Sequence, residues 1–349
     1  MGRLRYIGSK TRIRKEILDL IGKPTSLNKN FVDLFCGTGV ISQEASLMGW
    51  KVKANDHLLS SSIITIAHLL SEEEITFEKF GGYINALTDL NNTPPVPGFI
   101  FNEYTPEGSS RSGHVRMYFT PINGMKIDAI RSRINEWFDI GLINIKERTL
   151  LIADLLSAAN SIANIAGTYG CYLSHWDNSA LRSLILTPRK LFNHRVEFQV
   201  TNKDAFQIKT DVADVIYIDP PYTKRQYAAY YHILETIAHG DAPKVDGITG
   251  LRPWKEKLSL FCYKVKALKA LERLIDNINA HKIFLSYSSE GHMSLEDIDS
   301  LFSNFGETTI NNVSNIGRYR PNQKASVVET VVTEYLIELT KKTAIEVVP

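Results

Sequence analysis

The sequence over residues 31–39, Phe-Val-Asp-Leu-Phe-Cys-Gly-Thr-Gly, decides the fold class because an apolar strand-like run passes directly into two glycines. Apolar residues then recur with helical spacing over residues 40–48, and a second short strand candidate follows at 52–54. A strand, a glycine turn, a helix and another strand form the repeating unit of α/β proteins. We therefore predict an α/β fold.

The same pattern resumes late in the chain. Helical patterns over residues 227–238 and 254–278 separate further apolar runs. The strand candidates of this second part are residues 196–200, 215–218, 283–287, 308–313 and 330–339. The last two flank a polar, basic loop and predict a closing β-hairpin.

A long insertion interrupts the sheet. The interval from Gly39 to Asp219 is about twice the roughly 90 residues that three strand–helix units of about 30 residues would occupy. It contains a Pro/Gly-rich stretch at 93–113, followed by helical patterns at 126–138 and 147–166. We predict a mostly helical inserted domain. The predicted boundaries are 1–71 and 195–349 for the two parts of the sheet domain and 72–194 for the insertion.

Composition excludes several classes of protein. The 349 residues include 40 Lys+Arg and 38 Asp+Glu, with 44% hydrophobic and 22% charged residues, which argues against disorder and a polybasic tail. No apolar run reaches the ~18 residues of a membrane span, and the basic start lacks a signal-peptide pattern. We therefore expect a cytoplasmic protein with no membrane partner. Cys36, Cys171 and Cys262 lie far apart, so we predict neither a disulfide framework nor a metal site.

The glycine turn is a candidate ligand site, because Gly37 and Gly39 let the backbone approach a ligand and expose helix amides. Ser42 stands where the dinucleotide fingerprint needs a third glycine or alanine, so a nucleoside without phosphates fits better than a nicotinamide dinucleotide. Asp56, which ends the next strand, can accept hydrogen bonds from both ribose hydroxyls. An ordinary β-turn with an Asn-Asp helix cap explains either motif equally well.

The second motif is Asp219-Pro220-Pro221-Tyr222, at the end of an apolar strand. Proline removes backbone donors and leaves the local carbonyls free to accept. The Asp219 carboxylate and the Pro220 carbonyl can each accept one N–H of a planar amine, while a flat base stacks on Tyr222 for about 1–3 kcal/mol. The motif predicts an amine-binding cup; the alternative is an Asx-Pro turn.

Together with Tyr6-Ile-Gly8-Ser-Lys10, these motifs resemble, in type and order, the Dam-type (alpha-class) DNA adenine amino-methyltransferases. The stretch from Arg225 to Glu235 resembles the subgroup of restriction–modification systems. The resemblance implies a Rossmann-like, S-adenosylmethionine-dependent methyltransferase sheet with an inserted target-recognition domain. It also implies methylation of the exocyclic amine of a flipped-out adenine in double-stranded DNA, with a cognate restriction endonuclease as partner.

The resemblance also assigns roles to residues. Asp219, Pro220, Pro221 and Tyr222 are the implied catalytic residues. The implied cofactor-binding residues are Tyr6, Gly8, Lys10, Asp33, Phe35, Gly37, Thr38, Gly39, Asp56, Asp204 and Ala205. Among them Lys10 is expected near the donor's carboxylate and Asp204 near its adenine amine, although a lone acid after a strand is often only a helix cap.

DNA binding must rest on a local field, since the sequence pI is about 8.2. The candidate contacts are Arg111, Arg116, Lys126, Tyr169, Arg318 and Arg320. Arg111 or Arg116 is expected to read guanine, and Tyr169 lies in an aromatic stretch at 164–176 that resembles the part of the family's insertion facing the target base. A solvated face, or for Tyr169 a buried aromatic turn, is the competing explanation.

Three other functions remain open. The cup recognises only a planar amine, so an RNA adenine or protein-glutamine amino-methyltransferase is the nearest alternative. A catalytically silent nucleic-acid-binding module and a nicotinamide dehydrogenase fit the motifs less well. Methylation of a ring carbon is disfavoured because it needs a cysteine nucleophile and no Pro-Cys motif is present.

Overall fold

The computed structural model describes residues 5–317 and 331–342. The chain divides into two compact units. The sheet unit comprises Ser9–His57, Glu197–Gln226 and Leu258–Pro349. The helical unit comprises Met1–Gly8, Leu58–Val196 and Tyr227–Lys257.

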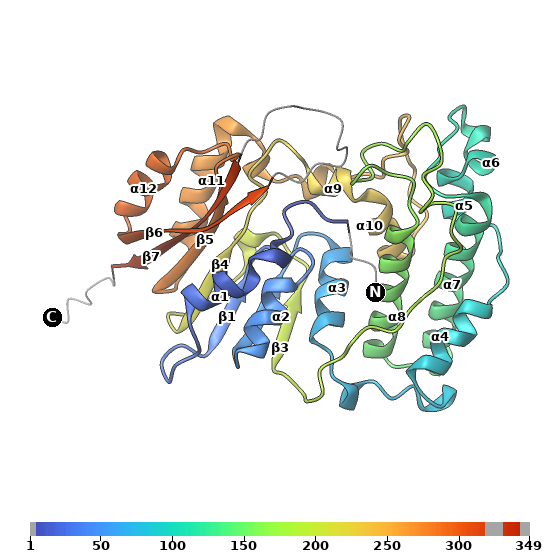
Figure 1. Cartoon of the computed structure of the whole chain (residues 1–349), viewed down its shortest axis with the longest axis horizontal. Helices are drawn as coiled ribbons and strands as arrows, with labels where there is room; N and C mark the ends of the chain where they lie inside the picture. Colours follow the sequence, from blue (N-terminus) through green and yellow to red (C-terminus); the bar gives the residue numbers. More distant parts are fainter. Residues whose placement is uncertain (1–4, 318–330, 343–349) are drawn as a thin grey trace. The chain divides into compact units, whose positions relative to one another are not determined.

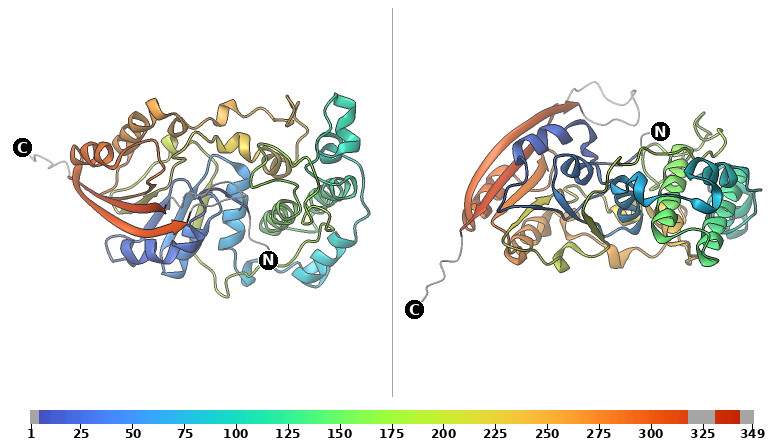
Figure 2. Two further views of the ribbon diagram at one scale, coloured as in Figure 1. Left: turned by 45° about the horizontal axis from the view of Figure 1, so that its top comes forward. Right: turned by 90° about the horizontal axis from the view of Figure 1, so that it is seen from below.

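A seven-stranded sheet forms the first unit, with strand order β3-β2-β1-β4-β5-β7-β6 (Figure 1). The strands are β1 (Asn30–Asp33), β2 (Lys51–Asn55), β3 (Phe198–Thr201), β4 (Asp214–Ile218), β5 (Lys282–Ser288), β6 (Gly306–Gly317) and β7 (Val331–Lys341). The first five run parallel, and β7 is antiparallel to both β5 and β6. The predicted α/β, Rossmann-like class is confirmed, and Figure 2 shows β6 and β7 as long curved strands at one edge of the sheet.

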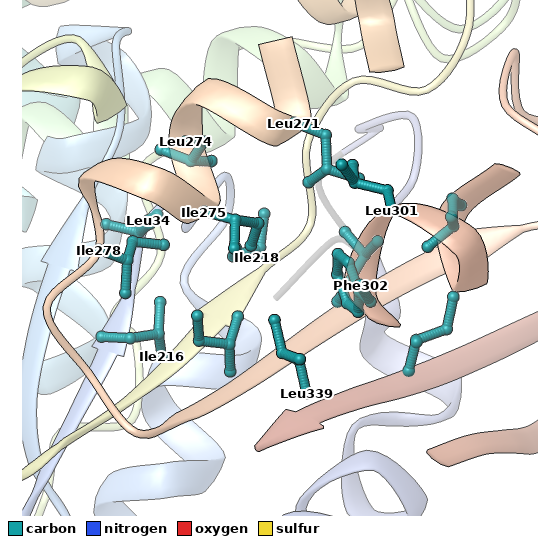
Figure 3. Close-up of a cluster of buried hydrophobic side chains, with 14 of the residues drawn as sticks. Leu34, Ile216, Ile218, Leu271, Leu274, Ile275, Ile278, Leu301, Phe302 and Leu339 are labelled. Carbon is teal, nitrogen blue, oxygen red and sulfur yellow. The ribbon is translucent and has the colours of Figure 1, made fainter. Parts of the chain in front are cut away.

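Alternating side chains of the strands pack on opposite faces of this sheet. Ile216 and Ile218 of β4 join Leu271 and Ile275 in a buried apolar cluster with the helices that follow β4 and β5 (Figure 3). On the other face the Phe31 ring lies 6.0 Å from that of Tyr217. The helices of the unit are η1 (Lys10–Arg12), α1 (Arg14–Ile21), α2 (Val40–Leu47), η5 (Ala205–Gln207), η7 (Leu260–Cys262), α11 (Lys264–Asn277) and α12 (Leu295–Ser303). Both faces of the central strands are therefore buried, which explains their continuous apolar sequences.

The second unit is mostly helical. Its α-helices are α3 (Leu59–Leu69), α4 (Tyr83–Asn92), α5 (Phe99–Tyr104), α6 (Pro106–Ser109), α7 (Pro121–Asp139), α8 (Ile145–Ser161), α9 (Tyr227–Tyr230) and α10 (His232–His239). Its short 3₁₀ turns are η2 (Glu72–Glu74), η3 (Glu78–Phe80), η4 (Ser110–Ser112) and η6 (Lys255–Lys257). The unit takes in α3, α9 and α10 as well as the predicted insertion at 72–194, and the predicted domain boundaries stay a prediction.

Candidate active site

The glycine turn joins β1 to α2 in the sheet unit. Gly37 and Gly39 have φ angles of 51° and 74°, in the left-handed region that side chains disfavour, so glycine is needed at both positions. The Gly37 N–H donates to Asp56 Oδ2 at 2.9 Å, which ties the turn to the end of β2. The glycine turn and Asp56 therefore lie together, and the ribose contact expected for Asp56 stays a prediction.

Asp33 closes β1 and lies buried below the turn. Its Oδ2 accepts the Ser42 hydroxyl at 2.7 Å, so the residue that replaces the third glycine of the dinucleotide fingerprint anchors an acid. Burial raises the pKa of Asp33 to about 7, and the negative charges of Asp219 and Asp56 contribute in the same direction. Three carboxylates therefore influence one another at this end of the sheet.

Asp204 follows β3 and caps the short turn η5. Its Oδ1 accepts the Phe206 N–H at 3.1 Å, and Ala205 behind it is buried. The sheet register pairs Asn55 with Thr201, so Asp56 and Asp204 leave neighbouring strands at the same edge. The helix-cap role and the expected adenine contact are compatible, because a carboxylate has several acceptor sites.

The Asp219-Pro220-Pro221-Tyr222 segment leaves β4, the strand next to β1. The Leu34 N–H donates to the Tyr217 carbonyl at 3.1 Å, so the β1–β4 pairing continues to the point where both functional turns begin. Ligands of open α/β sheets bind outside the carboxyl ends of the strands, where the strand order reverses, as it does here between β1 and β4. The glycine turn and the Asp219 segment meet this requirement.

Lys10 lies buried against this segment. Its Nζ is 3.2 Å from Asp219 Oδ1, 3.1 Å from Glu334 Oε2 and 3.5 Å from the Tyr222 hydroxyl. Burial lowers the pKa of Lys10, but Asp219, Tyr222 and Glu334 outweigh it and hold this pKa well above the ordinary value. All three ammonium protons thus face protein groups, so contact with a donor's carboxylate requires Lys10 to exchange one of these partners.

The Asp219 carboxylate responds to the same groups. Burial raises its pKa to about 6; Lys10 opposes the rise and Glu334 adds to it. Asp219 is therefore mostly ionised at pH 7 and can accept a hydrogen bond from an amine. The Tyr222 ring is held by an edge contact with Tyr287, at 5.6 Å between centroids.

Comparison with known proteins agrees with this geometry. The model of the D12 class N6 adenine-specific DNA methyltransferases matches residues 6–301. The chain belongs to this family. The predicted resemblance to the adenine amino-methyltransferases is confirmed, and membership implies a methyl donor.

Several relatives carry restriction–modification names. The chain is 37% identical to the type II methyltransferase M.FokI of Planomicrobium okeanokoites, over 87% of this chain and 47% of that protein. It is 34% identical to modification methylase StsI of Streptococcus sanguinis, over 93% and 50%. Identity to the type II methyltransferase M.NlaIII of Neisseria lactamica is 36%, over 87% and 89%. The chain thus spans about half the length of the first two relatives and most of the third.

In this member of the D12 family, the amino-terminal motif is shared between the two units. Tyr6 and Gly8 belong to the helical unit, where the Tyr6 ring stacks on Tyr231 at 4.4 Å. The Ile7 N–H donates to the Tyr231 hydroxyl at 2.7 Å, and the Tyr227 hydroxyl donates to the Ile7 carbonyl at 3.1 Å. Two tyrosines in the Arg225–Glu235 stretch therefore hold this motif in place.

Two predicted DNA contacts, Arg116 and Tyr169, are buried, and a third, Lys126, is half-buried. The Arg116 guanidinium is 2% exposed and donates to Glu103 and to the carbonyls of Gly247 and Ile248, so the predicted guanine contact is corrected. Lys126 Nζ donates to the Asn91 and Thr93 carbonyls at the end of α4. A buried charge needs such partners, which explains why the Arg116 guanidinium faces inward. Lys126 stays a predicted DNA contact.

Tyr169 is fully buried, in line with the buried-turn explanation of its stretch. Its N–H donates to the Tyr230 carbonyl at 2.9 Å, and Asn164 accepts the Asp177 N–H within the same turn. Arg111 is exposed and stays a predicted contact. Arg318 and Arg320 lie outside the described residues.

Glu334 is the site residue that sequence reasoning missed. It lies between Val332 and Leu336 on the buried face of β7, although its surroundings in sequence are those of an ordinary strand. An acid at an apolar position of an alternating strand is the one signal that could have revealed it.

Metal sites and membrane spans concern the described ranges, residues 5–317 and 331–342. Within these ranges no three His, Cys, Asp or Glu side chains are grouped so that they could hold a metal ion. In the same ranges no helix is long and apolar enough to span a membrane.

Proposed function

We propose that this chain transfers a methyl group from S-adenosylmethionine to the exocyclic N6 amine of a flipped-out adenine in double-stranded DNA. The observation that carries the proposal is the Asp219–Tyr222 segment at the carboxyl end of β4, beside the glycine turn of β1. The description of the family and the names of the relatives support the same activity.

The charges at this edge of the sheet fit the proposed donor. Asp33, Asp56 and Asp219 add negative charge around the glycine turn, which attracts a cationic sulfonium and repels a pyrophosphate. Gly37 and Gly39 leave the backbone accessible, so they and Asp56 are the residues proposed to hold the donor. The rest of the proposed set is Tyr6, Gly8, Lys10, Asp33, Phe35, Thr38, Asp204 and Ala205. When bound, the donor supplies a methyl group on a positively charged sulfur.

The cup residues act on the target amine. An aromatic amine is a poor nucleophile because its lone pair is delocalised into the ring. Hydrogen bonds from its two N–H groups to the Asp219 carboxylate and the Pro220 carbonyl favour a pyramidal nitrogen and stabilise positive charge that develops on it. Tyr222 offers its ring for stacking, and Pro221 restricts the segment that holds both acceptors. Positioning of the amine supplies much of the rate.

The biological setting follows from the proposed activity. A modification enzyme protects host DNA from a restriction endonuclease that reads the same site, so such an endonuclease is the proposed partner. We also propose a cytoplasmic location, where a modification enzyme meets the DNA that it protects. Arg111, Lys126, Arg318 and Arg320 remain the proposed contacts to DNA.

A methyl-transfer assay tests the proposal. Tritium from the methyl group of S-adenosylmethionine should enter duplex DNA as N6-methyladenine, and Asp219→Ala should abolish this label. Label found only in RNA or in protein glutamine would refute the DNA assignment in favour of another planar amine. Sequencing of modified bases in DNA from a host that expresses the chain then gives the recognition site.

A further inference from the structure

A buried acid outside the recognised motifs contacts the same ammonium as Asp219. Glu334 Oε2, on β7, lies 3.1 Å from Lys10 Nζ, and Asp219 Oδ1, just after β4, lies 3.2 Å from the same nitrogen. The side chains of Lys10, Asp219 and Glu334 are only 4%, 16% and 10% exposed. The family match ends at residue 301, so it does not reach Glu334.

Glu334 changes the net charge of the cup. Lys10 and Asp219 alone form a neutral pair, which gives little net attraction to a positive charge. Glu334 adds a second carboxylate and leaves the ionised group of three with an excess negative charge. Positive charge develops on the amine nitrogen in the proposed reaction, and fixed negative charge in a water-poor site stabilises it.

Glu334 also restrains Lys10. A lysine side chain has a flexible four-carbon stem and loses about 2 kcal/mol of rotamer entropy when it is fixed. The backbone of Glu334 pairs with Ser288 at the end of β5, so its carboxylate is presented from a rigid strand. Because the Lys10 ammonium is shared between two carboxylates, it stays next to Asp219 but pairs with it less strongly than it would alone.

We propose that Glu334 is a positioning residue for the methyl transfer: it shares the Lys10 ammonium with Asp219 and so leaves the Asp219 carboxylate available to accept a hydrogen bond from the target amine. This inference rests on the proposed function. The other titratable groups that face Asp219 are Tyr217 on β4, Tyr222 beyond it and Asp33 on β1.

Kinetics of matched variants test the role. Glu334→Gln keeps the size of the side chain but removes its charge, so Lys10 pairs fully with Asp219. We expect kcat to fall about tenfold or more, and the acidic limb of the pH–rate profile to move down by about one unit. Glu334→Asp should restore part of the rate. The control is Glu338→Gln on the same strand as Glu334. It removes a 3.0 Å ion pair with Lys282 of β5 and should leave kcat and the pH–rate profile unchanged.

A second readout needs no substrate. The unfolding midpoints of Glu334→Gln, Asp219→Asn and the double variant report whether both acids act on one ammonium. The double variant leaves the buried Lys10 without a carboxylate. The fall in its unfolding midpoint should therefore exceed the sum of the falls in the two single variants. The inference is overturned if Glu334→Gln keeps the kcat and the pH profile of the wild type, or if the falls in the unfolding midpoints are additive. A wild-type chain that methylates no DNA instead overturns the proposed function, while the midpoints still test the coupling.

Discussion

Removal of the Glu235 carboxylate should destabilise the helical unit strongly. Glu235 of α10 accepts the backbone N–H groups of Leu59 and Ser60 at 2.9 and 3.0 Å, so it caps α3 from a distant part of the chain. It also accepts the Ser60 hydroxyl at 2.8 Å and pairs with Lys257 at 2.6 Å and with His239 at 3.3 Å. Its side chain is 3% exposed, so water cannot replace these partners.

The magnitude follows from the groups left behind. In Glu235→Ala two helix-terminal N–H groups lose their acceptor, at about 1–3 kcal/mol each, and Lys257 loses its buried partner. We expect the free energy of unfolding to fall by about 3–5 kcal/mol, the range for breaking a buried ion pair. Glu235→Gln keeps one acceptor oxygen and should lose less than Glu235→Ala.

The pH dependence has a definite sign. Burial raises the pKa of Glu235, but His239, Lys257 and the Ser60 N–H outweigh it and hold the pKa well below the ordinary value. An acid whose pKa is lowered in the folded state contributes stability that is fully present above its unfolded pKa, about 4.3. This stability is lost as the pH falls toward the folded pKa. The gap between wild type and Glu235→Gln should therefore stay constant from pH 7 to about 5 and narrow below about 4.

Urea unfolding of the whole chain measures both effects. Glu136→Gln is the matched control, because Glu136 is 54% exposed in an ion pair with Arg133 and should change stability by less than about 1 kcal/mol. A Glu235→Ala protein no less stable than this control would refute the capping argument.

Three further predictions concern the site and the DNA contacts. As the pH falls from 7 to 5, Asp219, whose pKa burial raises to about 6, loses the ionised form that accepts the amine, so kcat should fall roughly tenfold in the methyl-transfer assay. Arg116→Met leaves the Glu103 carboxylate and two loop carbonyls without their donor, so the free energy of unfolding, measured with a denaturant, should fall by about 3 kcal/mol. Arg111→Ala should reduce the slope of log affinity for duplex DNA against log salt by about 1.

Each of these has its own control. Burial raises the pKa of Asp33 to about 7, so the pH profile is repeated with Asp33→Asn, whose amide oxygen can still accept the Ser42 hydroxyl; the limb near pH 6 should persist. Equal rates at pH 5 and 7 contradict the role of Asp219. A stable Arg116→Met protein with a reduced salt slope restores Arg116 as a DNA contact, and an unchanged slope in Arg111→Ala removes Arg111 from the interface.

Much of the fold was predictable from local patterns. The runs at 215–218 and 283–287 correspond to β4 and β5, because a strand buried on both faces has a largely apolar sequence. The short run at 52–54 lies in β2, which also contains Lys51 and Lys53. The helical patterns at 126–138 and 147–166 correspond to α7 and α8. The pattern at 254–278 is divided: η6 lies in the helical unit, and α11 begins at Lys264 in the sheet unit.

The partners of buried charges were not predictable. Arg116 meets the carbonyls of Gly247 and Ile248, 131 and 132 residues away, and Lys10 meets Glu334 across 324 residues. Neither Arg116 nor Lys10 has a sequence environment that distinguishes it from a solvated cation, and Glu334 lies in an ordinary strand pattern. Whether a charge is buried depends on which distant groups can hydrogen-bond it, and no local pattern carries that information.

The sequence by itself determined the α/β class, the glycine turn after β1 and the Asp-Pro-Pro-Tyr segment after β4, because strand periodicity and proline or glycine chemistry act within a few residues. Only the tertiary structure decided that Lys10 sits between Asp219 and Glu334, that Tyr227 and Tyr231 hold the amino-terminal motif, and that Arg116 is internal. These contacts join segments far apart in the chain, and burial, charge and hydrogen bonding select them together only once the chain is folded.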